Sequence, residues 1–199
     1  MERKITFNKS AIFVLAITLT FLSVGAAIAD GAIGWAALKS SGHVALLRHA
    51  IAPGTGDPEE FDVKDCATQR NLSAEGRLQA KRIGDRLRAN GIDRPAVFSS
   101  QWCRCLETAR LLSLGPVTEL TALNSFFRDF EQRESRTVAL TTWIKERDLR
   151  YPVILVTHQV NITALTGVYP SSGELIIVRR SENGKLKVVD TIETRIETN

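Results

Sequence analysis

The stretch HVALLRH, residues 43–49, is an apolar run that ends in an arginine and a histidine. A second run of the same kind, YPVILVTH at 151–158, also ends in a histidine. Continuous apolar runs of this length are typical of strands buried on both faces, as in a parallel sheet covered by helices. The two runs therefore predict central strands, and they place Arg48, His49 and His158 where those strands end.

Helical and strand-like segments alternate along the rest of the chain. The patterns predict helices over 73–91, 103–115, 135–150 and 159–167, and strands over 95–100, 173–180 and 185–193. In the first helix we expect Leu78, Ile83 and Leu87 to share the buried face. The last two strands flank an Asn-Gly turn and form a hairpin. This order predicts one α/β domain over residues 30–199, a three-layer α/β/α sandwich with a mostly parallel sheet and a C-terminal antiparallel hairpin at its edge.

The first 29 residues differ from the rest in composition. Three basic residues precede a long uncharged apolar run, and residues 27–29 form the small-x-small pattern of a signal-peptidase site. We expect cleavage before Asp30 and a mature domain that is periplasmic or secreted. The alternative is an uncleaved N-terminal anchor, because the apolar run is about long enough to span a bilayer.

The net charge gives little indication of a charged macromolecular partner. The formal charge of +4 falls to +2 when the three basic residues and the one acid of residues 1–29 are removed. So small an excess does not indicate binding to nucleic acid or to an acidic membrane surface. We expect a monomer whose mature form has no membrane span unless the N-terminal segment is retained.

Three cysteines, Cys66, Cys103 and Cys105, lie in the mature part, and none has a CxxC or a Cys/His metal spacing. In an oxidising compartment, three thiols are expected to give one disulfide and one free thiol. Cys103 and Cys105 are too close in sequence for an easy mutual bridge, so Cys66 is expected to pair with one of them. The alternative is three unreacted buried thiols.

Ligands bind beyond the carboxyl ends of the strands in a sheet of this kind. Arg48 and His49 end one strand, Arg104 opens the helix after another, and His158 ends a third. Guanidinium groups match phosphate oxygens, and an imidazole can carry a phosphoryl group transiently. A metal site would need carboxylate or thiolate ligands near the histidines, and Arg48 would repel the cation. The four residues thus predict a phosphoryl-transfer site without a metal.

Three segments, LLRHA at 46–50, SSQWCRCLETA at 99–109 and VTH at 156–158, resemble the histidine phosphatase superfamily, which has the phosphoglycerate mutase-like fold. The resemblance spans nearly the whole mature chain. It implies that His49 is the nucleophile that becomes phosphohistidine, and that Arg48, Arg104 and His158 hold the phosphate, with no cofactor. The small size and expected export resemble the SixA-like phosphohistidine phosphatases and the Ais-like lipopolysaccharide heptose phosphatases.

The general acid of the family has no direct counterpart. Leu123-Asn124-Ser125 stands where the mutases have Leu-Asn-Glu, and Gln159 follows the late histidine where the phytase-like branch has an acid. Mutase activity is therefore not expected. The acids that could take over the role, or that could belong to solvated acidic loops, are Asp129, Glu131, Glu134, Asp57 and Glu59.

Together these patterns predict an exported phosphatase that hydrolyses phosphomonoesters through phosphohistidine on His49. Its substrate would be a phosphorylated small molecule or an envelope glycolipid, with the loops 51–72 and 121–136 lining the leaving-group side. One alternative is a phosphate- or phosphosugar-binding protein that has lost turnover. The other is a phosphohistidine phosphatase in signalling.

Overall fold

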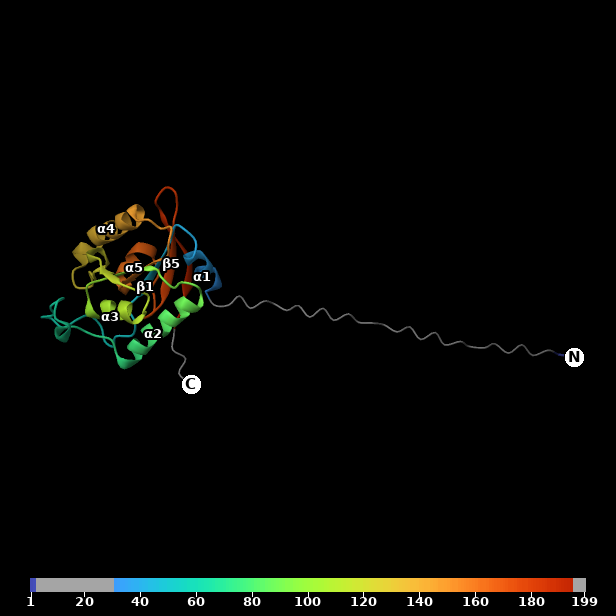
Figure 1. Ribbon diagram of the computed structural model, residues 1–199, viewed down its shortest axis with the longest axis horizontal. Helices are drawn as coiled ribbons and strands as arrows, with labels where there is room; N and C mark the ends of the chain where they lie inside the picture. Colours follow the sequence, from blue (N-terminus) through green and yellow to red (C-terminus); the bar gives the residue numbers. More distant parts are fainter. Residues whose placement is uncertain (3–30, 195–199) are drawn as a thin grey trace.

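The computed structural model describes residues 1–2 and 31–194. The predicted signal peptide, apart from its first two residues, lies outside this described part. Within the part that is described, no helix has the length and apolar character needed to cross a membrane. Figure 1 shows the described chain as a central sheet with helices on both sides, which is the predicted three-layer arrangement.

A mixed sheet of six strands forms the middle layer, in the order β3-β2-β4-β1-β5-β6. The strands are β1 His43–Arg48, β2 Ala96–Ser99, β3 Val117–Glu119, β4 Val153–Thr157, β5 Leu175–Arg180 and β6 Leu186–Ile192. The first four are parallel to one another, and β5 is antiparallel to both β1 and β6. The mostly parallel sheet and the C-terminal hairpin are therefore confirmed, but only β6 of the hairpin is an edge strand. The other edge is β3, which escaped prediction because it is short and mostly exposed.

Five α-helices cover the two faces of the sheet (Figure 1). They are α1 Ala32–Leu38, α2 Ala74–Ala89, α3 Cys103–Leu111, α4 Arg133–Glu146 and α5 Gln159–Thr166, with short 3₁₀ turns η1 Cys66–Thr68, η2 Thr121–Leu123 and η3 Phe130–Gln132. The helices α1, α2 and α3 pack on one face, and α4 and α5 pack on the other. The predicted helix over 103–115 ends earlier, because the chain turns at Ser113 into a positive φ of 53°.

The central strands are apolar throughout because they contribute to two cores at once. Along β1, Leu47 points into the core under α1, α2 and α3, whereas Leu46 points into the core under α4 and α5. Val156 and Leu155 of β4 divide in the same way. This alternation is the period of two of a β-strand, and it explains why the inner residues of both strands are apolar whichever face they point to.

The buried face of α2 differs from the one we expected. Ile83 and Leu87 are buried, but Leu78 is 45% exposed. Five residues separate Leu78 from Ile83, which turns the side chain about 140° around the helix axis. The helix instead approaches the core through Gly84, where an added Cβ would lie 2.1 Å from the carbonyl oxygen of Leu112.

Candidate active site

The carboxyl ends of β1, β2 and β4 meet at one edge of the sheet and form a pocket there. Arg48 is the last residue of β1 and His49 follows it, His158 follows β4 and precedes α5, and Arg104 lies in the first turn of α3. All four line a single cavity of about 120 Å³. The structure thus brings together the four residues that the sequence placed at separate strand ends.

His49 is held with one ring nitrogen free. Its Nδ1 lies 2.8 Å from the carbonyl oxygen of Ala50, and because a carbonyl only accepts, Nδ1 must carry the proton. Burial of the ring, together with the nearby charge of Arg104, lowers the pKa of His49 well below its ordinary value. The imidazole is therefore neutral near pH 7, and Nε2 keeps an unprotonated lone pair.

His158 has the opposite tautomer. The guanidinium of Arg104 donates to its Nδ1 at 3.4 Å, so the proton is on Nε2, which donates to the hydroxyl of Ser100 at 2.8 Å. Burial, with Arg104 as the next cause, also lowers the pKa of His158 well below its ordinary value. The two rings stand edge to face with their centroids 5.6 Å apart. The pocket therefore contains two neutral imidazoles side by side.

Two arginine donors at the pocket lack acceptors. Arg48 donates from Nη1 to the carbonyl oxygen of Pro170 at 2.7 Å, and Arg104 donates from both Nη atoms to Asp57. The Nε atoms of Arg48 and Arg104 are buried and have no hydrogen-bond partner among the described residues. A buried donor without an acceptor lowers the stability of the protein by about 1–3 kcal/mol, and by more when the donor is charged. Such a pair of donors favours binding of an oxyanion at this place.

Asp57 is the only carboxylate among the described residues that line the pocket. Its Oδ1 accepts from Arg104 Nη1 at 2.7 Å and from the backbone N of Arg70 at 3.1 Å. Its Oδ2 accepts from Arg104 Nη2 at 3.2 Å and from Trp102 Nε1 at 3.1 Å. Burial alone would raise the pKa of Asp57, but the hydrogen bonds and charge of Arg104 outweigh burial and lower it. The carboxylate is therefore ionised and already accepts two hydrogen bonds on each oxygen.

This ion pair fixes which edge of Arg104 is available to a ligand. Asp57 takes the Nη1/Nη2 edge of the guanidinium and Nη2 also bonds to Nδ1 of His158, so among the described residues Nε is the nitrogen of Arg104 that has no partner. Bidentate pairing of this kind restricts the guanidinium to one plane. Asp57 therefore orients Arg104.

Arg70 is a pocket residue that the sequence analysis missed. It lines the cavity, and its guanidinium donates to the carbonyl oxygens of Ala52 and Gly56. It lies in the irregular segment between β1 and α2, where neither a periodic pattern nor a strand end marks it. No signal in the sequence alone would have separated Arg70 from a solvated loop arginine.

Of the five acids considered as proton donors, Asp57 alone lies at the pocket. The other four, Glu59, Asp129, Glu131 and Glu134, are exposed and do not line it. Ser125 and Gln159, which stand at the positions where related enzymes have acids, do line it. No carboxyl group that holds a proton near pH 7 therefore faces the cavity from the described residues.

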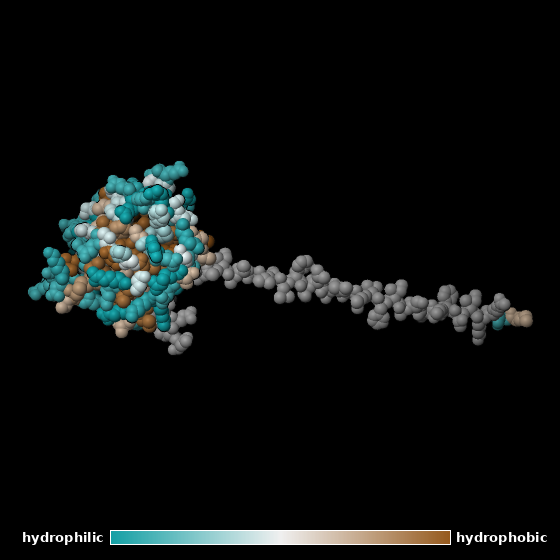
Figure 2. Space-filling view, viewed as in Figure 1, coloured by the Kyte–Doolittle hydropathy of each residue, from teal (hydrophilic) through white to brown (hydrophobic). Residues whose placement is uncertain are grey.

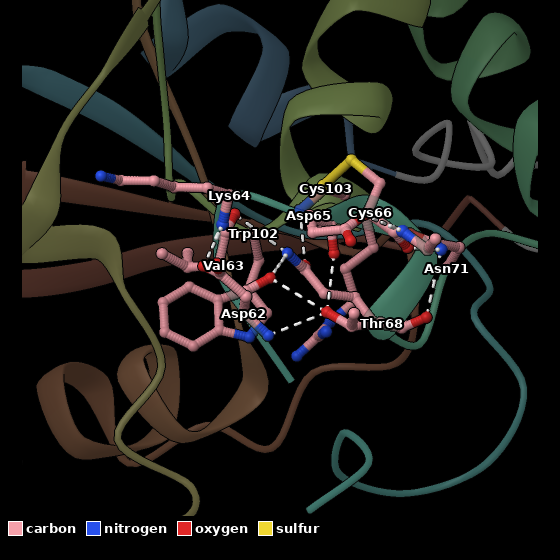
Figure 3. Close-up of a disulfide and its surroundings, with 12 residues drawn as sticks. Asp62, Val63, Lys64, Asp65, Cys66, Thr68, Asn71, Trp102 and Cys103 are labelled. Carbon is pink, nitrogen blue, oxygen red and sulfur yellow. Dashed lines mark hydrogen bonds between the residues drawn. A yellow bond between two sulfur atoms is a disulfide. The ribbon is translucent and has the colours of Figure 1, made fainter. Parts of the chain in front are cut away.

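A disulfide ties the loop of Asp57 and Arg70 to helix α3. Cys66 of η1 is bonded to Cys103, the first residue of α3 (Figure 3). The backbone N of Cys103 also donates to Oε1 of Gln69 at 3.0 Å. The expected pairing of Cys66 with a cysteine of this helix is confirmed. The bond lies one residue before Arg104, so it joins the two segments that form the ion pair.

Cys105 is the free thiol, and it is buried beside His158, with its Sγ 3.5 Å from Nε2. Burial raises the pKa of this thiol to about 12. The thiolate is the reactive form of cysteine, and it is absent near pH 7 at such a pKa. Cys105 therefore fills space beneath the pocket and does not act as a nucleophile.

Comparison with known proteins gives related sequences and folds. A family model described as histidine phosphatase superfamily (branch 1) matches residues 44–134. The serine/threonine-protein phosphatase Pgam5, mitochondrial, of Drosophila virilis is 39% identical over 74 residues, which are 37% of this chain and only 23% of that protein.

Solved structures are similar over most of the chain. The protein histidine phosphatase SixA, complexed with tungstate, has a TM-score of 0.55 at 14% identity, over 76% of this chain and 97% of that one. Phosphoserine phosphatase of Entamoeba histolytica, in complex with 3-phosphoglyceric acid, has a TM-score of 0.54 at 12% identity, over 77% and 98% of the two chains. At these identities the structures show that the fold is shared.

Replacing Asp57 with asparagine should weaken oxyanion binding. The amide removes the charge that pairs with Arg104 and places an NH₂ group against a donor, so the guanidinium loses its fixed orientation. Hydrogen bonds to charged groups are worth about 1.5–3 kcal/mol, so the Kd for tungstate should rise about 10- to 100-fold in calorimetry. Asp62→Asn is the matched control, because Asp62 is exposed in the same loop and its carboxylate accepts a hydrogen bond from the backbone N of Lys64. Unchanged or tighter binding in Asp57→Asn would show that Arg104 keeps its orientation without this carboxylate.

Proposed function

The chain belongs to the histidine phosphatase superfamily, and we propose that it is a phosphatase that hydrolyses phosphomonoesters through phosphohistidine at Nε2 of His49. One observation carries the proposal. The unpaired, buried Nε donors of Arg48 and Arg104 belong to the same pocket as the unprotonated Nε2 of His49. Donors for phosphate oxygens and a nucleophile for phosphorus are what a phosphoryl-transfer site must combine.

In the first step, the lone pair on Nε2 of His49 forms a bond to phosphorus. The bond from phosphorus to the ester oxygen breaks, and its electron pair leaves with that oxygen. Arg48 and Arg104 donate to the non-bridging oxygens and stabilise the charge in the transition state. The hydrogen bond from Nδ1 to Ala50 holds the ring in place while the imidazole becomes positively charged.

In the second step, a water oxygen attacks the phosphorus of phosphohistidine. The bond between phosphorus and Nε2 breaks, and its electron pair returns to the ring, so His49 is again neutral with its proton on Nδ1. Both protons of the attacking water leave with the phosphate as dihydrogen phosphate. The reaction thus closes with His49 as the one nucleophile that the protein supplies and water as the second.

The leaving group must depart without help from a carboxylic acid of the pocket. Asp57 is ionised and has four hydrogen bonds, and Ser125 and Gln159 are poor proton donors. Leaving groups that are weakly basic, such as phenolates, or already protonated, such as the nitrogen of a phosphoramidate, need no such donor. This favours aryl phosphates and phosphoramidates over simple alkyl phosphates.

Replacing His49 with alanine should abolish turnover, whereas replacing His43, which does not line the pocket, should not. Loss of a nucleophile lowers kcat by about 10⁴-fold or more. In rapid-quench experiments the wild type should give an acid-labile, base-stable phosphoenzyme on His49. His43→Ala is the matched control, because that ring bonds only to carbonyls at the start of β1 and should leave phosphate release unchanged. Saturable tungstate binding with no release from any phosphate would instead indicate a binding protein, and labelling of a serine would overturn the mechanism.

Without a proton donor in the pocket, kcat/KM should fall steeply as the leaving group becomes more basic. A positioned general acid is typically worth about 10²–10⁴-fold. We therefore expect 4-nitrophenyl phosphate to be hydrolysed at least about 100-fold faster than ethyl phosphate, measured as kcat/KM. Glu131→Gln and Asp129→Asn should leave both rates unchanged. Fast hydrolysis of ethyl phosphate that falls selectively in either variant would show that one of these acids donates the proton.

We also propose that the domain acts after export, as a periplasmic or secreted protein. The disulfide between Cys66 and Cys103 supports this, because such bonds persist in oxidising compartments. Its accessible substrates would then be phosphorylated small molecules or envelope glycolipids. N-terminal sequencing of the protein from the envelope fraction should begin at Asp30. Full-length protein with reduced cysteines in the cytosolic fraction would contradict this localisation.

A further inference from the structure

We propose that a groove beside the phosphate pocket binds the leaving group of the substrate, and that this leaving group is a phenol whose ring packs against phenylalanine side chains. This proposal rests on the phosphatase function proposed above. The groove, here called the aromatic groove, has apolar and aromatic walls formed by Phe126, Phe127, Phe130, Val160, Ala164 and Tyr169, and Arg133, Gln159 and Thr163 complete its lining.

The aromatic groove is continuous with the pocket. Gln159 and Val160, in the first turn of α5 directly after His158, line both the pocket and the adjoining cavity of about 180 Å³. Phe127 lines the pocket itself and lies near Phe130, with their ring centroids 6.0 Å apart. A group esterified to a phosphate in the pocket therefore has a path into the aromatic groove along the start of α5.

Three aromatic side chains of the groove are exposed to solvent. Phe127, Phe130 and Tyr169 are 40%, 61% and 76% exposed, whereas Phe126 is buried and lies edge to face with Phe130 at 6.2 Å. Figure 2 shows hydrophobic residues at the surface, among hydrophilic ones, on the face of the molecule that it displays. Clustered exposed aromatic side chains mark binding sites, and aromatic rings prefer to pack edge to face with one another. A flat aromatic ligand matches this surface.

The chemistry of the groove and of the pocket select the same class of leaving group. Aromatic and aliphatic side chains form most of the lining of the groove, and Arg133, Gln159 and Thr163 add polar atoms at its border, so the lining favours a ligand with a flat apolar body. The pocket, for its part, offers no protonated acid to an alkoxide, because Asp57 is fully engaged with Arg104, Arg70 and Trp102. A phenolate satisfies both conditions, since its ring is apolar and it departs without receiving a proton.

The size of the aryl group tests the proposal. Phenol and 2-naphthol are leaving groups of nearly equal basicity, so the second ring of 2-naphthyl phosphate adds contact area with little change in chemistry. We expect kcat/KM of the wild type to be about tenfold higher for 2-naphthyl than for phenyl phosphate, from the added apolar burial. In Phe130→Ala this ratio should fall to about one. Because the ratio is taken within one variant, a partial loss of folded protein cancels.

The control is Tyr151→Ala. Tyr151 is also an exposed aromatic residue, but it precedes β4 at the opposite edge of the sheet, so the ratio should remain about tenfold.

If the wild type hydrolyses acetyl phosphate but shows a ratio near one, the aromatic groove is not the leaving-group site and the phosphatase function stands. If none of the three phosphates is hydrolysed, the proposed function itself is wrong. If the ratio of 2-naphthyl to phenyl phosphate stays high in Phe130→Ala, the second ring of the substrate binds outside the aromatic groove and the proposal is wrong.

Discussion

The ion pair between Arg104 and Asp57 is the constraint on which the rest of the pocket depends. It joins the first turn of α3 to the irregular segment after β1, and the disulfide from Cys66 to Cys103 holds the same two segments together one residue away. The carboxylate takes one edge of the guanidinium and leaves the unpaired Nε for a ligand. Because all four acceptor positions of the carboxylate are filled, the same interaction that orients Arg104 also prevents Asp57 from serving as a general acid.

The charges of the pocket match a phosphate monoester. Arg48, Arg70 and Arg104 are cationic, Asp57 is anionic, and the two imidazoles are neutral because burial and the arginines lower their pKa. The net charge of +2 is equal and opposite to that of a dianionic phosphate. In the proposed mechanism the arginines thus act twice, since they attract the dianion and keep His49 unprotonated, as the proposed attack on phosphorus requires.

Sequence patterns predicted the parts of the molecule that follow a regular period. β1 and β4 were recognisable because burial on both faces makes a strand apolar throughout, and the residues that end them followed from the geometry of parallel sheets. Asp57 was named only as one of five candidate acids and Arg70 was not named, because their roles arise from loop contacts such as that between Arg70 and Gly56. Leu78 was wrongly assigned to the buried face of α2. The helix approaches the core through Gly84, and a glycine does not add to the apolar periodicity from which a buried face is predicted.

A crystal structure of the wild type with orthovanadate tests the central claim most directly. Vanadate adopts the trigonal bipyramidal geometry of a phosphoryl group in transfer. The account predicts a bond from vanadium to Nε2 of His49, with equatorial oxygens within hydrogen-bond distance of Nε of both Arg48 and Arg104, and with Asp57 still paired to Arg104. Vanadate bonded to another side chain, or bound with Arg104 turned away from Asp57, would contradict it.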